Sequence, residues 1–145
     1  MLKLSRPIVD IAITCSDFEK SLYFYHECLG FEIALDCEIP AALARGAGLA
    51  PRGFRQVRLQ AGHTLIKLME IDAPPPTPVL DFRAGVRWLS FFVEDLAQVV
   101  DKLEQKGVEF LSEPLSAPDA LGVVCAPDPD GILIELVELD EACSL

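Results

Sequence analysis

The chain has 145 residues, 51% of them hydrophobic, and a formal net charge of −11 at pH 7. This length and hydrophobicity predict one compact domain, residues 1–145, with its own core, and they argue against intrinsic disorder. The negative charge argues against nucleic acid or an anionic membrane surface as a partner, and no apolar run approaches the ~18 residues of a membrane span.

Alternation and helical spacing predict the elements of the first half. We expect a strand over residues 8–15, then a helix that Asp17 caps and Gly30 ends. A second strand follows over residues 31–36. Residues 38–53 are rich in Ala, Gly and Pro, so we expect a connection there with a short helical turn.

Two further strands complete the first half, over residues 54–60 and 63–71. We expect Ala61 and Gly62 to form the two-residue loop between them, which would set Gln60 opposite His63 and Gln56 opposite Lys67. The proline-rich residues 73–84 then predict a stiff linker.

The second half repeats the same order. A strand over residues 86–93 precedes a helix that Asp95 caps and Gly107 ends. We expect strands over 108–111, near 122–126 and over 132–139, with a turn at Asp128-Pro129-Asp130-Gly131 before the last one.

The two halves are copies of one unit. Residues 65–72 read LIKLMEID and residues 133–140 read LIELVELD, so Lys67 corresponds to Glu135. Counting seven residues back from each capping aspartate makes Asp10 and Trp88 equivalent. We therefore expect two β-α-β-β-β modules, residues 7–72 and 85–140, within the single domain.

Strand alternation separates the side chains that pack on the helices from those on the opposite face. We expect the two opposite faces to curl around a common cavity. Its predicted lining is Asp10, Gln56, Arg58, Lys67, Trp88, Phe92 and Glu135, with Phe54 and Met69 on the same face.

Three motifs carry a family resemblance: ITCSDFEKSLYFY at 13–25, LGF at 29–31 and DPDGILIEL at 128–136. With the duplicated module, they resemble the vicinal-oxygen-chelate superfamily, which includes glyoxalase I, extradiol dioxygenases and bleomycin-resistance proteins. The resemblance covers nearly the whole chain. It implies an α+β fold in which both modules form one open, strongly curved mixed β-sheet barrel around a cavity, with the helices outside, and it implies a homodimer.

In metal-dependent members the ligands come from the first and last strand of each module. The corresponding residues here are Asp10, Lys67, Trp88 and Glu135, of which only Glu135 matches the usual His, Glu or Gln. Lysine is a cation and tryptophan has no lone pair to donate, so we expect no metal and no other cofactor.

Two function classes remain open. In the first, Lys67 replaces the metal, Asp10 or Glu135 acts as a general base with a pKa raised by burial, and Arg58 holds a substrate carboxylate. That chemistry is metal-independent proton transfer beside a carbonyl, as in an isomerase, epimerase or lyase. These charged residues could equally form a structural salt-bridge cluster.

In the second class the protein binds a small organic molecule without chemistry, as drug-sequestering relatives do. Phe54, Met69, Trp88 and Phe92 would stack on a flat or apolar ligand, or they could be ordinary core. Arg45, Arg52 and Arg55 could attract an anionic tail or form a solvated loop.

Five cysteines form an odd set without C-x-x-C spacing. Together with an N-terminal segment too short for a signal peptide, they lead us to expect reduced thiols and a cytoplasmic protein.

Overall fold

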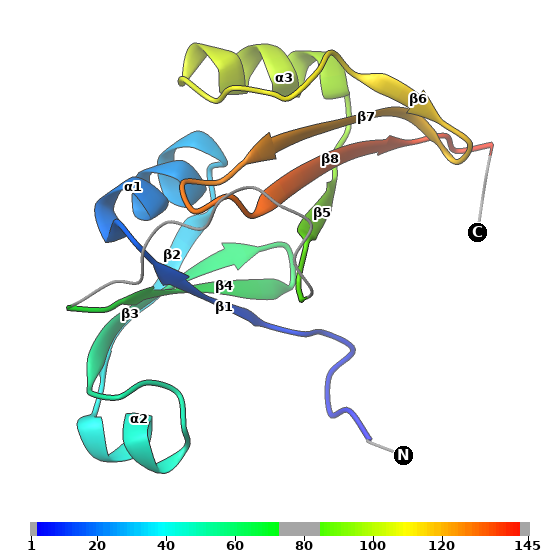
Figure 1. Cartoon of the computed structure of the whole chain (residues 1–145). Coiled ribbons are helices and arrows are strands. Elements are labelled where there is room, and N and C mark those ends of the chain that lie inside the picture. Colours follow the sequence, from blue (N-terminus) through cyan, green and yellow to red (C-terminus); the bar gives the residue numbers. More distant parts are fainter. Residues whose placement is uncertain (1–2, 73–84, 143–145) are drawn as a thin grey trace. The chain divides into compact units, whose positions relative to one another are not determined.

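The computed structural model describes residues 3–72 and 85–142, and the chain divides into two compact units, Met1–Pro76 and Thr77–Leu145 (Figure 1). The predicted linker at 73–84 lies outside the described residues.

Module one has the expected β-α-β-β-β order. Its mixed sheet has the strand order β1-β4-β3-β2, in which β1 runs parallel to β4 and the other pairs are antiparallel. The elements are β1 (Ile11–Cys15), α1 (Phe18–Leu22) with its π-helical continuation η1 (Tyr23–Cys28), β2 (Glu32–Ile39), α2 (Ala41–Gly46), β3 (Phe54–Ala61) and β4 (Thr64–Glu70).

The predicted helix signals act as expected. The Asp17 carboxylate accepts a hydrogen bond from the Lys20 N–H at 3.2 Å, which satisfies one of the free donors of the first turn. Gly30 follows the helix with a φ of +75°, a conformation that costs glycine little.

The core of module one lies between the sheet and α1–η1. Val57, Leu59, Ile66 and Leu68 have exposed fractions of 0 to 1%. Tyr25 of η1, at 0%, is buried with them. On the opposite face of the sheet, here called the open face, Ala44 of α2 packs with Phe54 and Met69.

The predicted hairpin register is wrong by two residues. Ala61 pairs with Thr64, so Gly62 and His63 form the loop, and Arg58 rather than Gln56 lies opposite Lys67. Gly62 has a φ of +60°, and a positive φ at the first loop residue is typical of a type II′ turn. Because the shift is even, every side chain keeps the face predicted for it.

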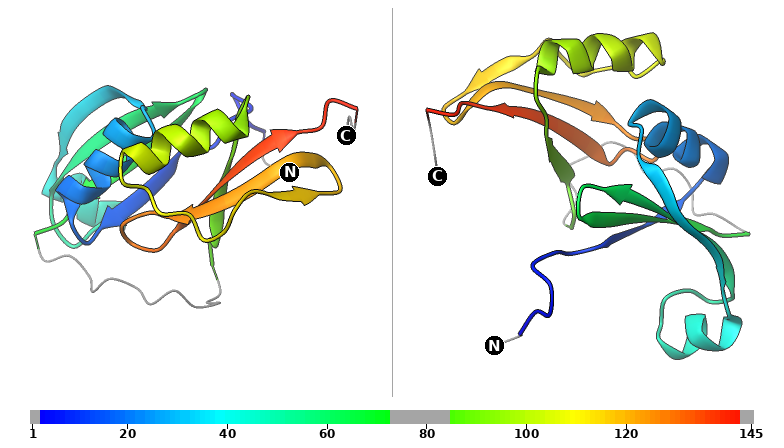
Figure 2. Two further views of the ribbon diagram at one scale, coloured as in Figure 1. Left: turned by 90° about the horizontal axis from the view of Figure 1, so that it is seen from above. Right: turned by 180° about the vertical axis from the view of Figure 1, so that it is seen from behind.

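Module two repeats this topology, which confirms the internal duplication. Its sheet order is β5-β8-β7-β6, and α3 lies along one face of it (Figures 1 and 2). The elements are β5 (Trp88–Phe92), α3 (Leu96–Gln105), β6 (Leu115–Ala117), β7 (Ala120–Pro127) and β8 (Leu133–Leu139).

The strand predicted over residues 108–111 is wrong. The Leu111 N–H donates to the Cys125 carbonyl at 2.9 Å, but the chain bends over 111–113 and pairs with β7 only from Leu115. Val108 is buried, so its hydrophobic signal reflects packing rather than a strand.

The fold is α+β, with a mixed four-stranded sheet that stays open in each module. Within the described residues, no helix is both long enough and apolar enough to cross a membrane.

Candidate functional site

The register places the side chains of the open face of module one in cross-strand rows, because directly paired residues share a face. One row contains Leu35, Arg58, Lys67 and Ala12. The next contains Cys37, Gln56, Met69 and Thr14. The face therefore carries two adjacent cations, Arg58 and Lys67.

Lys67 forms an ion pair with Asp10, which directly precedes β1. Lys67 Nζ lies 2.9 Å from Asp10 Oδ2, and both side chains are partly exposed. Asp10 Oδ1 accepts a second hydrogen bond, from the Leu65 N–H at 3.0 Å. Each oxygen of the Asp10 carboxylate therefore has its own partner, which fixes the orientation of the side chain.

These contacts lower the pKa of Asp10. The hydrogen bond from Lys67 is the largest cause, followed by the one from the Leu65 N–H, and both stabilise the ionised form. The expectation that burial raises this pKa is therefore wrong for Asp10, because the group is too exposed for desolvation to dominate.

Gln56 orients Arg58. Gln56 is only 7% exposed, and its Oε1 accepts a hydrogen bond from Arg58 Nε at 2.8 Å. Among residues 3–72 and 85–142, no carboxylate lies within 4.0 Å of the Arg58 guanidinium nitrogens. Its terminal nitrogens are therefore available for an anion, in the forked geometry that suits a carboxylate.

Phe54 and Met69 have a packing role in this structure. They are 4% and 7% exposed and form a small cluster with Ala44 of α2. Met69 Sδ also accepts a hydrogen bond from Thr14 Oγ1 at 3.8 Å. Their predicted role in ligand binding stays a prediction, and it would require α2 to move.

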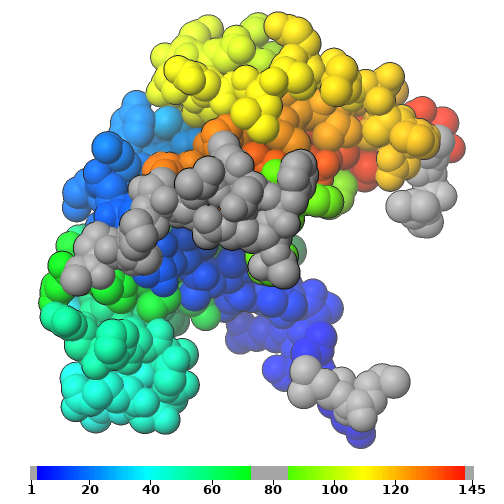
Figure 3. Space-filling view, in the orientation of Figure 1, coloured from blue at the N-terminus to red at the C-terminus, as the bar shows by residue number. Residues whose placement is uncertain are grey.

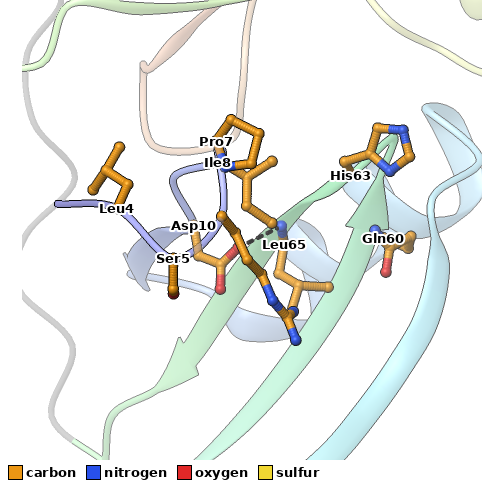
Figure 4. Close-up of a pocket in the computed structure, with 9 residues that line it drawn as sticks. Leu4, Ser5, Pro7, Ile8, Asp10, Gln60, His63 and Leu65 are labelled. Carbon is orange, nitrogen blue, oxygen red and sulfur yellow. Dashed lines mark hydrogen bonds between the residues drawn. The ribbon is translucent and has the colours of Figure 1, made fainter.

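A pocket of about 810 Å³ opens beside Asp10, between residues 4–8 and the β3–β4 hairpin (Figure 4). Asp10 and Leu65 line it, with Gln60 and His63 at the hairpin end. Figure 3 shows the wider setting, a hollow of module one between the N-terminal segment in dark blue and α2 in turquoise. The volume lies within the range of small-molecule sites.

Module two carries the other predicted residues on the face opposite α3. Trp88, Ser90 and Phe92 of β5 pair with Leu133, Glu135 and Val137 of β8. Trp88 is 53% exposed and Phe92 is 67% exposed, whereas Glu135 accepts a short hydrogen bond from Ser90 Oγ.

Cys125 lies opposite Glu135 in the β7–β8 register. Burial raises the pKa of its thiol, and the negative charge of Glu135 raises it further, while Arg87 lowers it. This thiol is therefore a weak nucleophile at neutral pH.

The structure brings Asp10, Lys67, Arg58 and Gln56 together on one face, and Trp88, Phe92 and Glu135 together on another. The predicted common cavity involves both modules and stays a prediction. Within the described parts of the chain, no three His, Cys, Asp or Glu side chains are grouped closely enough to hold a metal ion.

Sequence reasoning missed two neighbours of the predicted residues, Leu35 and Cys37 on β2. The bulge between Ile33 and Leu35 changes the alternation of β2, which hid both. Ser90, beside Glu135, corresponds to Ala12, beside Lys67, in the duplication.

Residues 8–136 match the model of the Glyoxalase/Bleomycin resistance protein/Dioxygenase superfamily. The chain belongs to this superfamily. It is 33% identical over 138 residues to the uncharacterized protein YwkD of Bacillus subtilis (strain 168). The aligned residues cover 93% of this chain and 98% of YwkD.

Solved structures with similar folds include two that cover nearly the whole chain. A glyoxalase family protein from Bacillus cereus has a TM-score of 0.74 at 22% identity, covering 96% of this chain and 98% of that one. TnmS3, an antibiotic binding protein from Streptomyces sp. CB03234, has a TM-score of 0.66 at 21% identity, covering 97% of this chain and 99% of that one. At these identities the likeness establishes the fold alone.

Proposed function

We propose that this protein is a metal-independent member of the superfamily that binds a small carbonyl- or carboxylate-bearing molecule on the open face of module one. We further propose that it acts on this molecule as an isomerase, epimerase or lyase. The observation that carries the proposal is the ion pair between Lys67 and Asp10, beside the available guanidinium of Arg58.

The residues at the family's metal positions do not fit a divalent metal. Lys67 places an ammonium where a ligand oxygen or nitrogen would stand, and Asp10 is already engaged by that ammonium. Trp88 offers no donor atom on the second module. We therefore assign the electrostatic role of the metal to Lys67.

The proposed chemistry is proton transfer next to a carbonyl. Arg58 binds a carboxylate of the ligand, and the two remaining N–H groups of Lys67 stabilise the oxygen of the enolate. Asp10, a carboxylate in contact with Lys67, accepts the proton from the adjacent carbon. Return of the proton to the other face gives an epimer, return to another atom gives an isomer, and loss of a neighbouring group gives an elimination product.

The test begins with a thermal-shift screen of small keto acids, thioesters and aromatic carboxylates. For each compound that binds, NMR in D₂O measures the exchange of the hydrogen next to its carbonyl. We expect exchange with the wild type and a loss of about 100-fold or more in Lys67→Met, because a preorganised charge is removed. Lys102→Met is the matched control, because Lys102 of α3 contacts only Gln98 among the described residues. Exchange that survives in Lys67→Met would show the catalytic proposal to be wrong.

A second candidate function is binding without chemistry. It is favoured by the exposed rings of Trp88 and Phe92, which lie on one face of module two, and by the shared fold with the antibiotic binding protein TnmS3. Trp88 is the single tryptophan of the chain, so its fluorescence reports directly on ligand stacking. We expect a flat ligand to quench it, and Phe92→Ala to weaken that binding, whereas Tyr23→Ala, on η1, leaves it unchanged.

We also propose a homodimer, because β2 and β6 end their sheets with unpaired edges. A sedimentation-velocity mass of a single chain would overturn this.

A further inference from the structure

We propose that the pocket between residues 4–8 and the β3–β4 hairpin binds a second anionic group of the ligand, a carboxylate or a phosphate, through Arg6 and His63. The ligand class would then be a dicarboxylate or a phosphorylated carboxylic acid. This inference rests on the proposed function, because the first carboxylate is the one assigned to Arg58.

The position of the pocket is the first support. Asp10 lines it and is also the ion-pair partner of Lys67, so the pocket adjoins the row of Arg58 and Lys67. Figure 4 shows Asp10 hydrogen-bonded to Leu65, with His63 beyond Gln60 at the end of the hairpin, and all four residues line the pocket. A ligand held at Lys67 can therefore extend into this pocket.

The charge of the lining is the second support. Arg6 lines the pocket, and no carboxylate of the described residues pairs with it. His63 lines it from the loop of the hairpin, and its imidazole is likewise without an ion-pair partner in residues 3–72 and 85–142. The one acidic residue in the lining, Asp10, is neutralised by Lys67. Glu32, which pairs with Gln60 on the edge strand β2, is not part of the lining.

The setting in the whole chain makes this local excess of positive charge informative. The protein has a net charge of −11 and only 12 Lys and Arg residues. Two of these, Arg58 and Lys67, are on the open face, and a third, Arg6, lines the adjoining pocket. A protein of this net charge repels an anion on average, so the neighbouring positive charges of Arg6, Arg58 and Lys67 offer a dianion a favourable region.

Gln60 gives the pocket a fixed wall. Its Nε2 donates to the Gly62 carbonyl at 2.6 Å and to the Thr64 carbonyl at 3.5 Å, which ties its side chain to the turn. The hairpin that carries His63 is therefore braced, and the apolar parts of Leu4, Pro7 and Leu65 can cover the methylene groups of the ligand.

The experiment compares three probes by calorimetry at constant ionic strength: butyrate, glutarate and 3-phosphonopropionate. The α,ω-dicarboxylates from malonate to adipate then measure the span between the two anion sites. We expect the wild type to bind the best dianion about 3- to 10-fold more tightly than butyrate, which is what one further hydrogen bond of ordinary strength provides. Preference for glutarate or for the phosphonate identifies the second group as carboxylate or phosphate.

Arg6→Gln should abolish the preference for the dianion and leave butyrate binding unchanged. His63→Gln should reduce the same preference. Lys102→Gln is the matched control, because it removes one positive charge from α3, outside the lining of the pocket. Arg6 is exposed, so the variant folds normally, and an unchanged melting temperature verifies this.

The outcomes separate this inference from the proposed function. If Arg58→Gln weakens all three probes but Arg6→Gln leaves the dianion preference intact, the second site is wrong and the proposed function stands. If butyrate does not bind while a dianion binds through Arg6, the pocket is supported and the assignment of Arg58 fails. If no dianion binds the wild type, the inference is overturned.

Discussion

At the scale of single residues, the ion pair of Asp10 and Lys67 shows how a lysine in place of a carboxylate at position 67 alters a site. A carboxylate at position 67 would repel Asp10 and leave both available to a cation. The ammonium instead binds Asp10 and lowers its pKa, which favours ionised Asp10 at every physiological pH.

This lowered pKa predicts how stability depends on pH. The ordinary value for Asp10 is 3.8, and the folded-state value lies below it. The ionised carboxylate therefore contributes stability that is fully present above pH 3.8 and is lost as the pH falls through the folded-state pKa. We expect Asp10→Asn to lower the melting temperature near neutral pH, and we expect its difference from the wild type to shrink as the pH falls below 3.8. In a Lys67→Met background the same substitution should have little effect, and a full effect there would contradict the assigned cause.

The pair of Cys125 and Glu135 gives a second prediction at this scale. Because burial and Glu135 raise the pKa of the thiol, its alkylation by iodoacetamide should require a higher pH than that of an unperturbed cysteine. Glu135→Gln should shift the pH dependence of the Cys125 alkylation rate to lower pH. Mass spectrometry of the peptide that contains Cys125 measures this rate. Glu104→Gln, on the exposed side of α3, should not shift that pH dependence. An unchanged profile in Glu135→Gln would show that burial alone acts.

At the scale of elements, the β3–β4 hairpin decides which residues oppose each other. The loop at Gly62 and His63 sets Arg58 beside Lys67 and brings His63 to the pocket. A loop at Ala61 and Gly62 would have placed Gln56 in that position and separated the two cations.

Gly62 provides a direct test of this hairpin. Its φ is +60°, and a Cβ there would meet no atom within 4 Å, so any cost of Gly62→Ala is conformational rather than steric. We expect a loss of about 1–2 kcal/mol in the free energy of unfolding, measured with urea. Gly46→Ala is the matched control, since Gly46 also has open space around it but lies in α2 without a positive φ. Equal effects of the two substitutions would contradict the turn assignment.

At the scale of the whole molecule, the duplication gives both modules the same topology but different chemistry. Module one presents charges, Asp10, Arg58 and Lys67, on its open face, and module two presents the rings of Trp88 and Phe92. The two proposed functions therefore draw on different modules.

Metal content tests the proposal that this protein works without a metal ion. We expect protein purified without an affinity tag to hold far less than one metal ion per chain, and zinc, nickel or manganese to cause no thermal shift, because Lys67 and Trp88 replace two ligands. Stoichiometric metal with a clear thermal shift would show that the ligand assignment is wrong, and Asp10 and Glu135 would then be the first residues to substitute.

Local signals in the sequence were enough to predict the duplicated β-α-β-β-β order, the caps at Asp17 and Asp95, and the face on which each site residue lies. These depend on periodicity and on contacts within a few residues, which the chain itself carries. The tertiary structure alone decided that Arg58 opposes Lys67, that α2 covers Phe54 and Met69, and that residues 4–8 form a pocket with His63. Those features depend on register and on packing between distant segments, for which a single sequence holds no periodic signal.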